Sequence, residues 1–315
     1  MSKIKLLLKL LETGQFEGEE WLVLKKALKP LFYEPRGCMP WTRIFISDWK
    51  LELESFKETI LMNHLTADEL VVAYSDKASS LLQGAQAKSF LTLPDLLPKW
   101  SADKLNNPQK ELWEVLMAKM TLQNIERERA LLLIAQFAEM SNSQSRKSNA
   151  GQVAETTIEL ILQSSGLEKG TGYGKQWKSA RGSDTDFIIP WKEDEASHGI
   201  QAYIAVQGSS NDRARMASSE LHRGAKRFMC SLNGCPASSK NTNDMGKELV
   251  ADLLDDETTY VVVEKERQRA IEKANRDLAK ETGSSNKVML KKRITWLEEY
   301  SCSFNDFFEY AKGSV

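Results

Sequence analysis

The sequence has few of the features that would place it in a specialised class of protein. Four cysteines are spread over 315 residues, too few for a disulfide framework, and this scarcity favours a reducing compartment such as the cytoplasm. No stretch approaches 18 uninterrupted apolar residues, so we expect no membrane-spanning segment. Lysines interrupt the first apolar run and no small-residue cleavage site follows it, which argues against a signal peptide.

A large net charge and the common cofactor motifs are missing as well. Lys and Arg number 43 and Asp and Glu number 44, so no global positive field attracts nucleic acid, although a local basic face would be enough for binding. The chain carries no P-loop, no dinucleotide fingerprint and no Ser or Cys nucleophile motif. His222, Cys230 and Cys235 lack the paired spacing of a zinc site, so packing or surface thiols are the simpler interpretation.

Helical periodicity dominates the first part of the chain. Apolar residues recur at helical spacing in residues 3–12, 19–28, 49–82 and, most clearly, 108–139. The segment from Phe32 to Arg43 has prolines and a glycine that disfavour regular structure, and its aromatic and arginine side chains suit either a packed loop or a DNA-contacting loop. We therefore predict an all-helical N-terminal domain, residues 1–145, for DNA recognition or dimerisation.

A change of composition marks a second domain. Residues 140–149 are rich in serine and asparagine, which predicts the domain boundary there. Beyond it, short strands alternate with helices, so residues 146–315 are predicted to form an α/β (α+β) core with a central mixed sheet flanked by helices. We predict a helix over residues 150–165, then a glycine-rich loop over 170–182. Strands are predicted at 187–189, 200–206, 226–229 and 259–263.

Polar residues stand at the ends of the two central predicted strands. Asp186 opens one strand, Gln207 ends the next, and a polar helix start follows. Phosphodiester hydrolysis needs a metal to polarise the phosphate and to lower the pKa of the attacking water, and Mg2+ prefers carboxylates at fixed positions. These residues therefore favour a magnesium-dependent nuclease site. Asp186 could instead cap the hairpin or pair with Arg181, and Gln207 could be a structural amide at the sheet edge.

This order of residues resembles the PD-(D/E)XK nuclease superfamily, in particular type II restriction endonucleases. That family has a glutamate on a helix, then an aspartate at a strand, then an acid-x-lysine triplet on the adjacent strand, and then a helix along the DNA. Glu155 matches the helix glutamate and Asp186 the first aspartate. The triplet position reads Ala205-Val206-Gln207, so alanine replaces the acid and glutamine replaces the lysine.

The resemblance implies a role for each matching residue. Gln207 would hydrogen-bond the nucleophilic water, as glutamine does in some members of the superfamily. Some restriction enzymes carry the triplet acid on the following helix, and Glu220 stands 13 residues after Gln207 where such an acid is expected. Glu155 is the other candidate for the metal, and both glutamates could contribute. Asp184 is either a turn residue or a second ligand.

DNA contacts are expected from the polar helix start and from the glycine-rich loop. Arginines can bind phosphate or guanine edges, and a loop that has basic residues but no acid suits a phosphate-facing surface. The candidates are Ser209, Asn211, Arg213, Arg215, Lys175, Lys178 and Arg181.

Together these patterns predict a sequence-specific, Mg2+-dependent endonuclease of the restriction-modification type that hydrolyses phosphodiester bonds of double-stranded DNA. Cutting both strands usually needs two sites, so we expect a homodimer or a heterodimer with a related subunit. The alternative is a nicking or non-catalytic DNA-binding subunit of a restriction or repair complex, because the triplet has lost its acid and its lysine.

Overall fold

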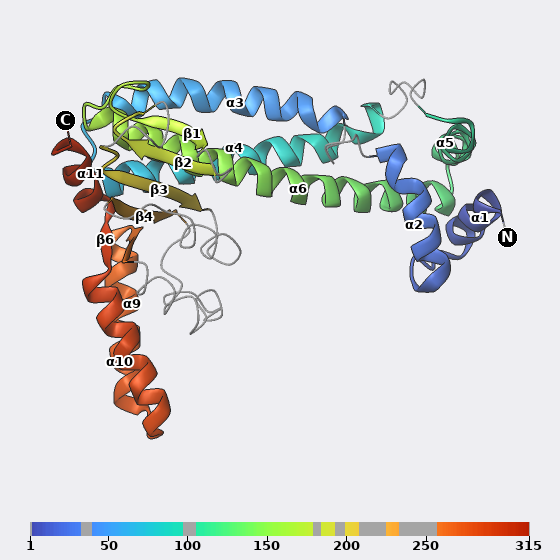
Figure 1. The fold of residues 1–315 in the computed structure, drawn as a ribbon. Helices are drawn as coiled ribbons and strands as arrows, with labels where there is room; N and C mark the ends of the chain where they lie inside the picture. Colours follow the sequence, from blue (N-terminus) through green and yellow to red (C-terminus); the bar gives the residue numbers. More distant parts are fainter. Residues whose placement is uncertain are drawn as a thin grey trace. The chain divides into compact units, whose positions relative to one another are not determined.

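The chain divides into two compact units. The structure is a computed structural model that describes residues 2–32, 40–96, 105–178, 184–192, 199–207, 225–232 and 257–314 (Figure 1). The first unit comprises Met1–Glu54 with Ser79–Asn149, and the second comprises Ser55–Ala78 with Ala150–Val315. The divisions fall inside helices α3 (Pro40–Leu61), α4 (Ala67–Leu96) and α6 (Ile125–Ser164). In the described ranges, no helix has the length and apolar character needed to cross a bilayer.

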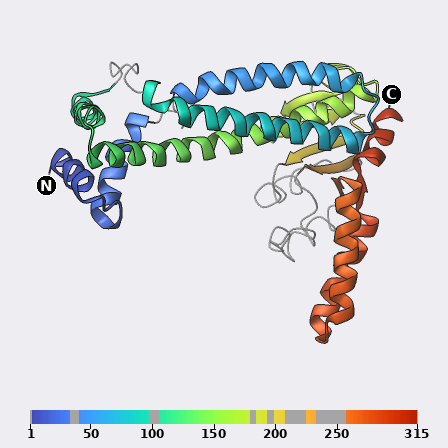
Figure 2. The ribbon, with the colours of Figure 1, turned by 180° about the vertical axis from the view of Figure 1, so that it is seen from behind.

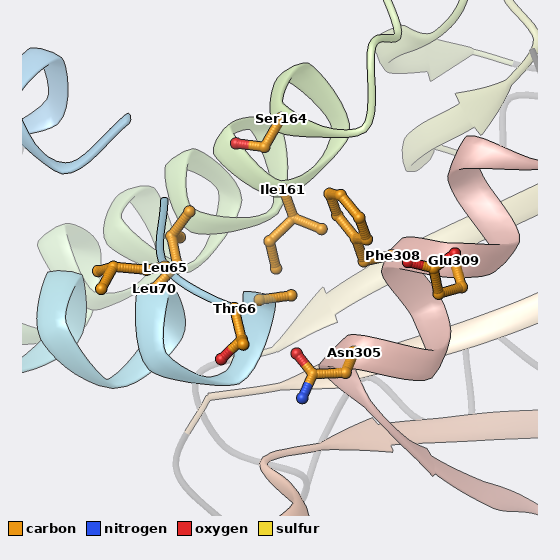
Figure 3. Close-up of a pocket in the computed structure, with 9 residues that line it drawn as sticks. Leu65, Thr66, Leu70, Ile161, Ser164, Asn305, Phe308 and Glu309 are labelled. Atoms are coloured by element: carbon orange, nitrogen blue, oxygen red, sulfur yellow. The ribbon is translucent and has the colours of Figure 1, made fainter. Parts of the chain in front are cut away.

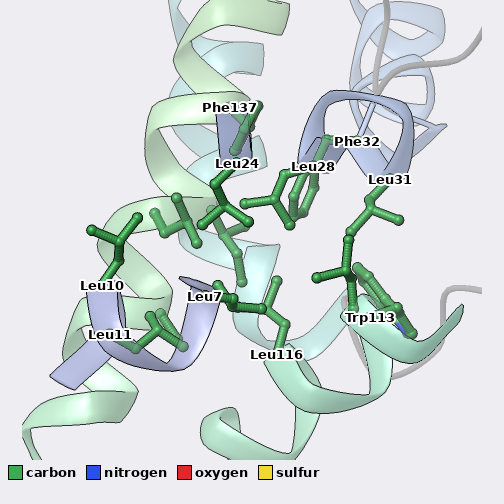
Figure 4. Close-up of a cluster of buried hydrophobic side chains, with 14 of the residues drawn as sticks. Leu7, Leu10, Leu11, Leu24, Leu28, Leu31, Phe32, Trp113, Leu116 and Phe137 are labelled. Atoms are coloured by element: carbon green, nitrogen blue, oxygen red, sulfur yellow. The ribbon is translucent and has the colours of Figure 1, made fainter. Parts of the chain in front are cut away.

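The described residues of the first unit form helices joined by short turns, without a strand, as the sequence predicts. Its helices α1 (Lys3–Thr13), α2 (Gly18–Phe32) and α5 (Asn107–Met120) pack with the start of α6 around one apolar core (Figure 4). Leu7, Leu24 and Leu116 are fully buried in that core. The ring of Phe32 stacks on that of Phe137, with 4.8 Å between centroids.

One helical prediction in this unit is wrong in its boundaries, and the predicted domain boundary, which agrees with the division of the units after Asn149, is not a break in helical structure. The single helix expected over 108–139 is interrupted after α5, because Asn124 accepts the backbone N–H of Glu126 at 3.1 Å and so begins a new helix. The boundary expected at 140–149 lies inside α6. Serine and asparagine are only modestly unfavourable in helices, and this stretch contains no proline or glycine to stop propagation.

The irregular segment expected between Phe32 and Arg43 is shorter than predicted. Helix α3 already begins at Pro40. Proline suits the first turn of a helix because the N–H it lacks would have no intrahelical partner there. Residues 33–39 lie outside the described part of the chain.

The second unit is built on a mixed six-stranded sheet, counted over the described residues. The strands lie in sequence order: β1 (Gly174–Lys178), β2 (Asp184–Ile189), β3 (Ala202–Gln207), β4 (Lys226–Ser231), β5 (Thr258–Val262) and β6 (Ser301–Ser303). β1, β2 and β3 pair antiparallel, whereas β3 to β6 pair parallel. The predicted mixed α/β class is therefore confirmed. β1 lies where a glycine-rich loop was expected. The strand was not predicted because glycine and lysine have low strand propensity.

Helices cover both faces of this sheet. On one face, Phe307 of α11 (Phe304–Lys312) meets the ring of Phe228 edge-on at 5.1 Å. On the other, α9 (Glu264–Lys280) and α10 (Ser284–Glu299) form one cluster with Met229. Phe228 and Met229 are successive residues of β4, so their side chains point to opposite faces. Figure 2 shows the same elements from behind.

One aspartate of α4 joins the starts of two other helices in this unit. Asp68 accepts the backbone N–H of Glu264 at 3.1 Å, where α9 begins without a side-chain cap of its own. It also accepts the N–H of Phe304 at 3.0 Å, where α11 begins. Burial raises the pKa of Asp68, and these two N–H donors oppose that shift. The carboxylate thus satisfies the unpaired donors of two helices and complements their dipoles.

We expect Asp68→Ala to lower the free energy of unfolding by about 2 to 4 kcal/mol, because two buried N–H groups lose their acceptor. Asp68→Asn should have a smaller effect, since its amide oxygen still accepts one N–H. Urea denaturation measures both. Asp76→Ala, at an exposed position of the same helix, is the control. An Asp68→Ala protein as stable as that control would show that the contacts contribute little.

Candidate functional site

Asp186 and the triplet position lie side by side on adjacent strands. β2 and β3 pair antiparallel, with Phe187 opposite Ile204. The half-buried Asp186 carboxylate accepts the backbone N–H of Val206 at 2.6 Å. The predicted adjacency of the two strands is thus confirmed, and it puts an acid next to the backbone of Ala205-Val206-Gln207.

The backbone of Gln207 ends β3 opposite Ser231, the last residue of β4. Because β3 and β4 are parallel, their carboxyl ends meet at one edge of the sheet, which is where α/β folds commonly bind ligands. Ser231 is a buried polar residue at this edge, with 2% of its surface exposed. The sequence did not single it out, because the strand was expected to end at Met229.

A second polar cluster joins α6 to β1. Its centre is Glu159, whose side chain is 10% exposed and lies 2.8 Å from the ammonium of Lys175. The Tyr173 hydroxyl donates to the same carboxylate at 3.2 Å, and the Lys169 ammonium lies at 3.3 Å. Every one of these residues therefore has a partner, as buried polar groups require.

The charges in this cluster stabilise one another. Burial alone would raise the pKa of Glu159, but the hydrogen bonds and positive charges of Lys175 and Lys169 outweigh it and hold that pKa below its ordinary value. Burial, together with the Glu159 charge, raises the pKa of Tyr173 to about 12. Tyr173 therefore keeps its proton and acts as a donor. The cluster is a buried ion pair with a neutral phenol bound to it.

Glu155 belongs to this cluster. Its carboxylate lies 3.7 Å from the Lys175 ammonium and accepts from the Gln176 amide at 3.4 Å. The same ammonium stands over the Phe187 ring, 5.7 Å from the centroid. Asp186 and Phe187 are successive strand residues, so their side chains point to opposite faces. Glu155 is thus on the Phe187 side of β2, and its sharing of a metal with Asp186 stays a prediction.

Lys175 was expected to bind DNA, but its partners are carboxylates. Its side chain is 20% exposed and is paired with both Glu155 and Glu159. The sequence identified Glu155 rather than Glu159, which is the more buried of the two. One signal was present: Glu159 stands among the buried residues Ile158 and Leu160, where a charge needs a partner.

Several predicted site residues lie outside the described residues. These are Glu220, Ser209, Asn211, Arg213, Arg215 and Arg181. Lys178 and Gln207 are described by their backbone alone. Among the described side chains, no three His, Cys, Asp or Glu groups gather as a metal site, and Glu220 is not in that set. Cys230 is buried in β4, where burial raises the pKa of its thiol, so it is packed as an apolar residue.

A separate cavity of about 270 Å³ opens beside α4, α6 and α11 (Figure 3). Its lining is mostly apolar, and includes Leu65, Leu70, Ile161 and Phe308. None of the predicted site residues lines it. It has the character of a gap between packed helices rather than of a site for phosphate chemistry.

Comparison of the chain with protein-family models, curated proteins and solved structures found no match. The residues and geometry of the chain itself must therefore support any functional assignment.

We expect Lys175→Met to lower the free energy of unfolding by about 1 to 3 kcal/mol at neutral pH, because Glu159 loses its nearest positive charge. The pKa of Glu159 is lowered in the folded state, so its stabilising contribution is present above the unfolded-state pKa and is lost as the pH falls. The difference between wild type and variant should therefore shrink below about pH 4, near the ordinary glutamate pKa.

Urea denaturation of wild type and Lys175→Met, at neutral pH and below about pH 4, measures the difference in their free energies of unfolding. Lys169→Met is the matched control, because Lys169 pairs with the same carboxylate but its side chain is 59% exposed. A Lys175→Met protein of unchanged stability with weakened DNA binding would assign Lys175 to the DNA surface instead.

Proposed function

We propose that the protein is a Mg2+-dependent endonuclease that hydrolyses double-stranded DNA in the manner of type II restriction endonucleases. The observation that carries this proposal is the 2.6 Å hydrogen bond from the Val206 N–H to the Asp186 carboxylate. It joins the aspartate of the resembled motif to the strand that holds the triplet position, and these are the two parts that a nuclease site of this kind needs side by side.

The order of the surrounding elements supports the same proposal. Glu155 lies on α6, Asp186 on the second strand, and Ala205-Val206-Gln207 on the strand beside it. This is the order of helix, aspartate strand and triplet strand that the resemblance implies. β4 then pairs parallel to β3, and the residues between the two strands are those in which the resemblance places the helix along the DNA.

The residues present fit a magnesium ion in their donor chemistry. Asp186 offers a half-buried carboxylate, and Mg2+ is usually bound through one or two carboxylates together with substrate phosphate and water. A bound Mg2+ would polarise the phosphate and lower the pKa of the attacking water. Gln207 would orient that water by accepting a hydrogen bond from it through the amide oxygen, and being neutral it would add no charge to the site.

Glu220 is the better candidate for the second carboxylate. The Glu155 carboxylate is held by Lys175 and Gln176 on the Phe187 side of β2. Recruiting it would break that ion pair, whereas Glu220 follows Gln207 at the distance expected for a relocated acid. Glu155 would then orient β1 rather than bind metal.

Asp186→Asn should lower the rate at which the protein cleaves plasmid DNA in the presence of Mg2+ by at least about 100-fold. The amide lacks the negative charge that would hold the ion. The Asn oxygen can still accept the Val206 N–H, so the fold and DNA binding should be kept. Agarose gels follow cleavage, and gel shifts without Mg2+ follow binding. Glu168→Gln, at an exposed position, is the control. Undiminished cleavage by Asp186→Asn removes this carboxylate from the site.

The same assay distinguishes Glu155 from Glu220 as the second metal ligand. Glu220→Gln should abolish cleavage to the extent that Asp186→Asn does. Glu155→Gln should retain most of it, with some loss of stability from the Lys175 pair. The opposite ranking would assign the metal to Glu155.

A second function is favoured by one observation. Ala205 and Gln207 stand where the resembled family has its acid and lysine, so the chain could be a nicking or non-catalytic DNA-binding subunit. Purified protein with Mg2+ distinguishes these outcomes on supercoiled plasmid. Linear product supports a dimer that cuts both strands, nicked circles support the nicking subunit, and intact plasmid that is nevertheless bound supports the non-catalytic subunit.

A further inference from the structure

The helical hairpin formed by α9 and α10 carries a positive charge, in a chain that has no net positive charge. Residues 264–299 contain ten Lys and Arg against seven Asp and Glu, and within them residues 269–293 contain eight against three. The two helices run side by side between β5 and β6 (Figures 1 and 2). No acid occurs between residues 282 and 297. The excess of positive charge in the hairpin is therefore concentrated between the middle of α9 and the middle of α10.

The basic residues of α9 form a continuous stripe on one side of the helix. They stand 4, 4, 3 and 4 residues apart, which is the spacing of one helix face. The members of this basic stripe are Lys265, Arg269, Lys273, Arg276 and Lys280. The acids Glu266, Glu272 and Asp277 flank the stripe, so its five basic residues outnumber the acids beside it by two.

The opposite side of α9 fixes the orientation of the stripe. Ala270 and Ala274 are buried there and pack with Tyr260 and Trp296. Small side chains allow the helix to approach its neighbours closely, so it is anchored by its apolar side. The basic stripe then points outward from a fixed support, which is the arrangement that a rigid binding surface needs.

Three of the five basic side chains of the stripe can bind a partner outside the chain. Lys265, Arg276 and Lys280 are exposed, and no ion pair between described residues engages them. Arg269 pairs with Glu266 but is 56% exposed. Arg269 is balanced by the acid three residues before it. Glu272 and Asp277 stand four and three residues before Arg276 and Lys280 but form no ion pair with them in the described part of the chain, so these unpaired members favour an external anion.

The dimensions of the stripe fit duplex DNA. Fifteen residues of helix span about 22 Å, the length over which duplex DNA carries about 13 phosphate charges. We propose that the α9–α10 hairpin is a phosphate-backbone contact surface for double-stranded DNA, distinct from the Asp186 edge of the sheet. This inference rests on the proposed function in that DNA is the partner. Contacts of this kind position a protein on DNA without reading its sequence.

Salt dependence tests the proposal directly. The full-length triple variant Lys265→Gln, Arg276→Gln, Lys280→Gln removes the three unpaired charges. Its binding to a labelled duplex of roughly 30 base pairs is followed by anisotropy in EDTA over a range of salt. Each lost phosphate contact lowers the slope of log K against log salt by about 0.9. We expect a slope smaller by about 2 to 3 and at least about 10-fold weaker binding at low salt.

The matched control replaces three exposed lysines of the second unit, Lys169→Gln, Lys226→Gln and Lys312→Gln, with the same change of net charge. Circular dichroism checks that both variants are folded. A hairpin variant with the slope and affinity of this control overturns the proposal. So does a hairpin variant that loses binding to phosphatidylserine vesicles while it keeps DNA binding, because the partner is then an acidic membrane.

Cleavage and binding are read separately, so the two proposals fail in different ways. If wild type binds DNA through the hairpin but leaves plasmid intact in Mg2+, the nuclease proposal is wrong and the hairpin surface stands. If plasmid is cut but the hairpin variant binds like the control, only the hairpin surface is wrong. Absence of duplex binding by wild type overturns the hairpin surface outright.

Discussion

Parallel pairing from β3 to β6 constrains most of the second unit. Parallel strands cannot be joined by a tight hairpin turn and need a longer crossover connection, which is usually helical. α9 and α10 form the connection between β5 and β6 and cover the Met229 face, while α11 covers the Phe228 face. Gln207 and Ser231 end their strands at one edge of the sheet, and Asp186, the third residue of β2, lies near the same edge.

This constraint explains the separate environments of the two acidic groups. Glu159 is buried between α6 and β1 and needs Lys175, Lys169 and Tyr173 to remain charged. Asp186 is half-buried at the strand edge and has a backbone donor as a partner. Two ammonium groups neutralise the charge of a carboxylate, which then attracts a metal ion only weakly. A carboxylate that accepts a backbone N–H keeps its full negative charge. Position in the sheet therefore separates a supporting acid from a candidate ligand.

The sequence predicts those parts of the fold that have a strong local period. The helices of the first unit, the strand beginning near Phe187 and the strand around Val261 were visible because burial imposes a spacing on their apolar residues. β1 and β6 were missed because glycine, lysine and serine carry no strand signal, and their pairing is set by neighbours distant in sequence.

The candidate site was predictable in part for the same reason. Motif order identified Asp186 and the triplet, and the pairing of β2 with β3 agrees with it. The partnership of Lys175 with Glu159 could not be predicted, because it depends on how α6 lies against β1. From its residue type alone, Lys175 was predicted to contact DNA. Burial and charge pairing are properties of the packed structure and not of the local sequence.

The contacts of Asp68 have a consequence for how the chain completes its fold. They connect position 68 to positions 264 and 304, across 196 and 236 residues of sequence. Closing so long a loop costs entropy that is repaid only when both partner helices are present. On the ribosome, these contacts of Asp68 form only after nearly the whole chain has been synthesised. A fragment that begins at residue 146 lacks Asp68 and would carry two helix starts without this acceptor.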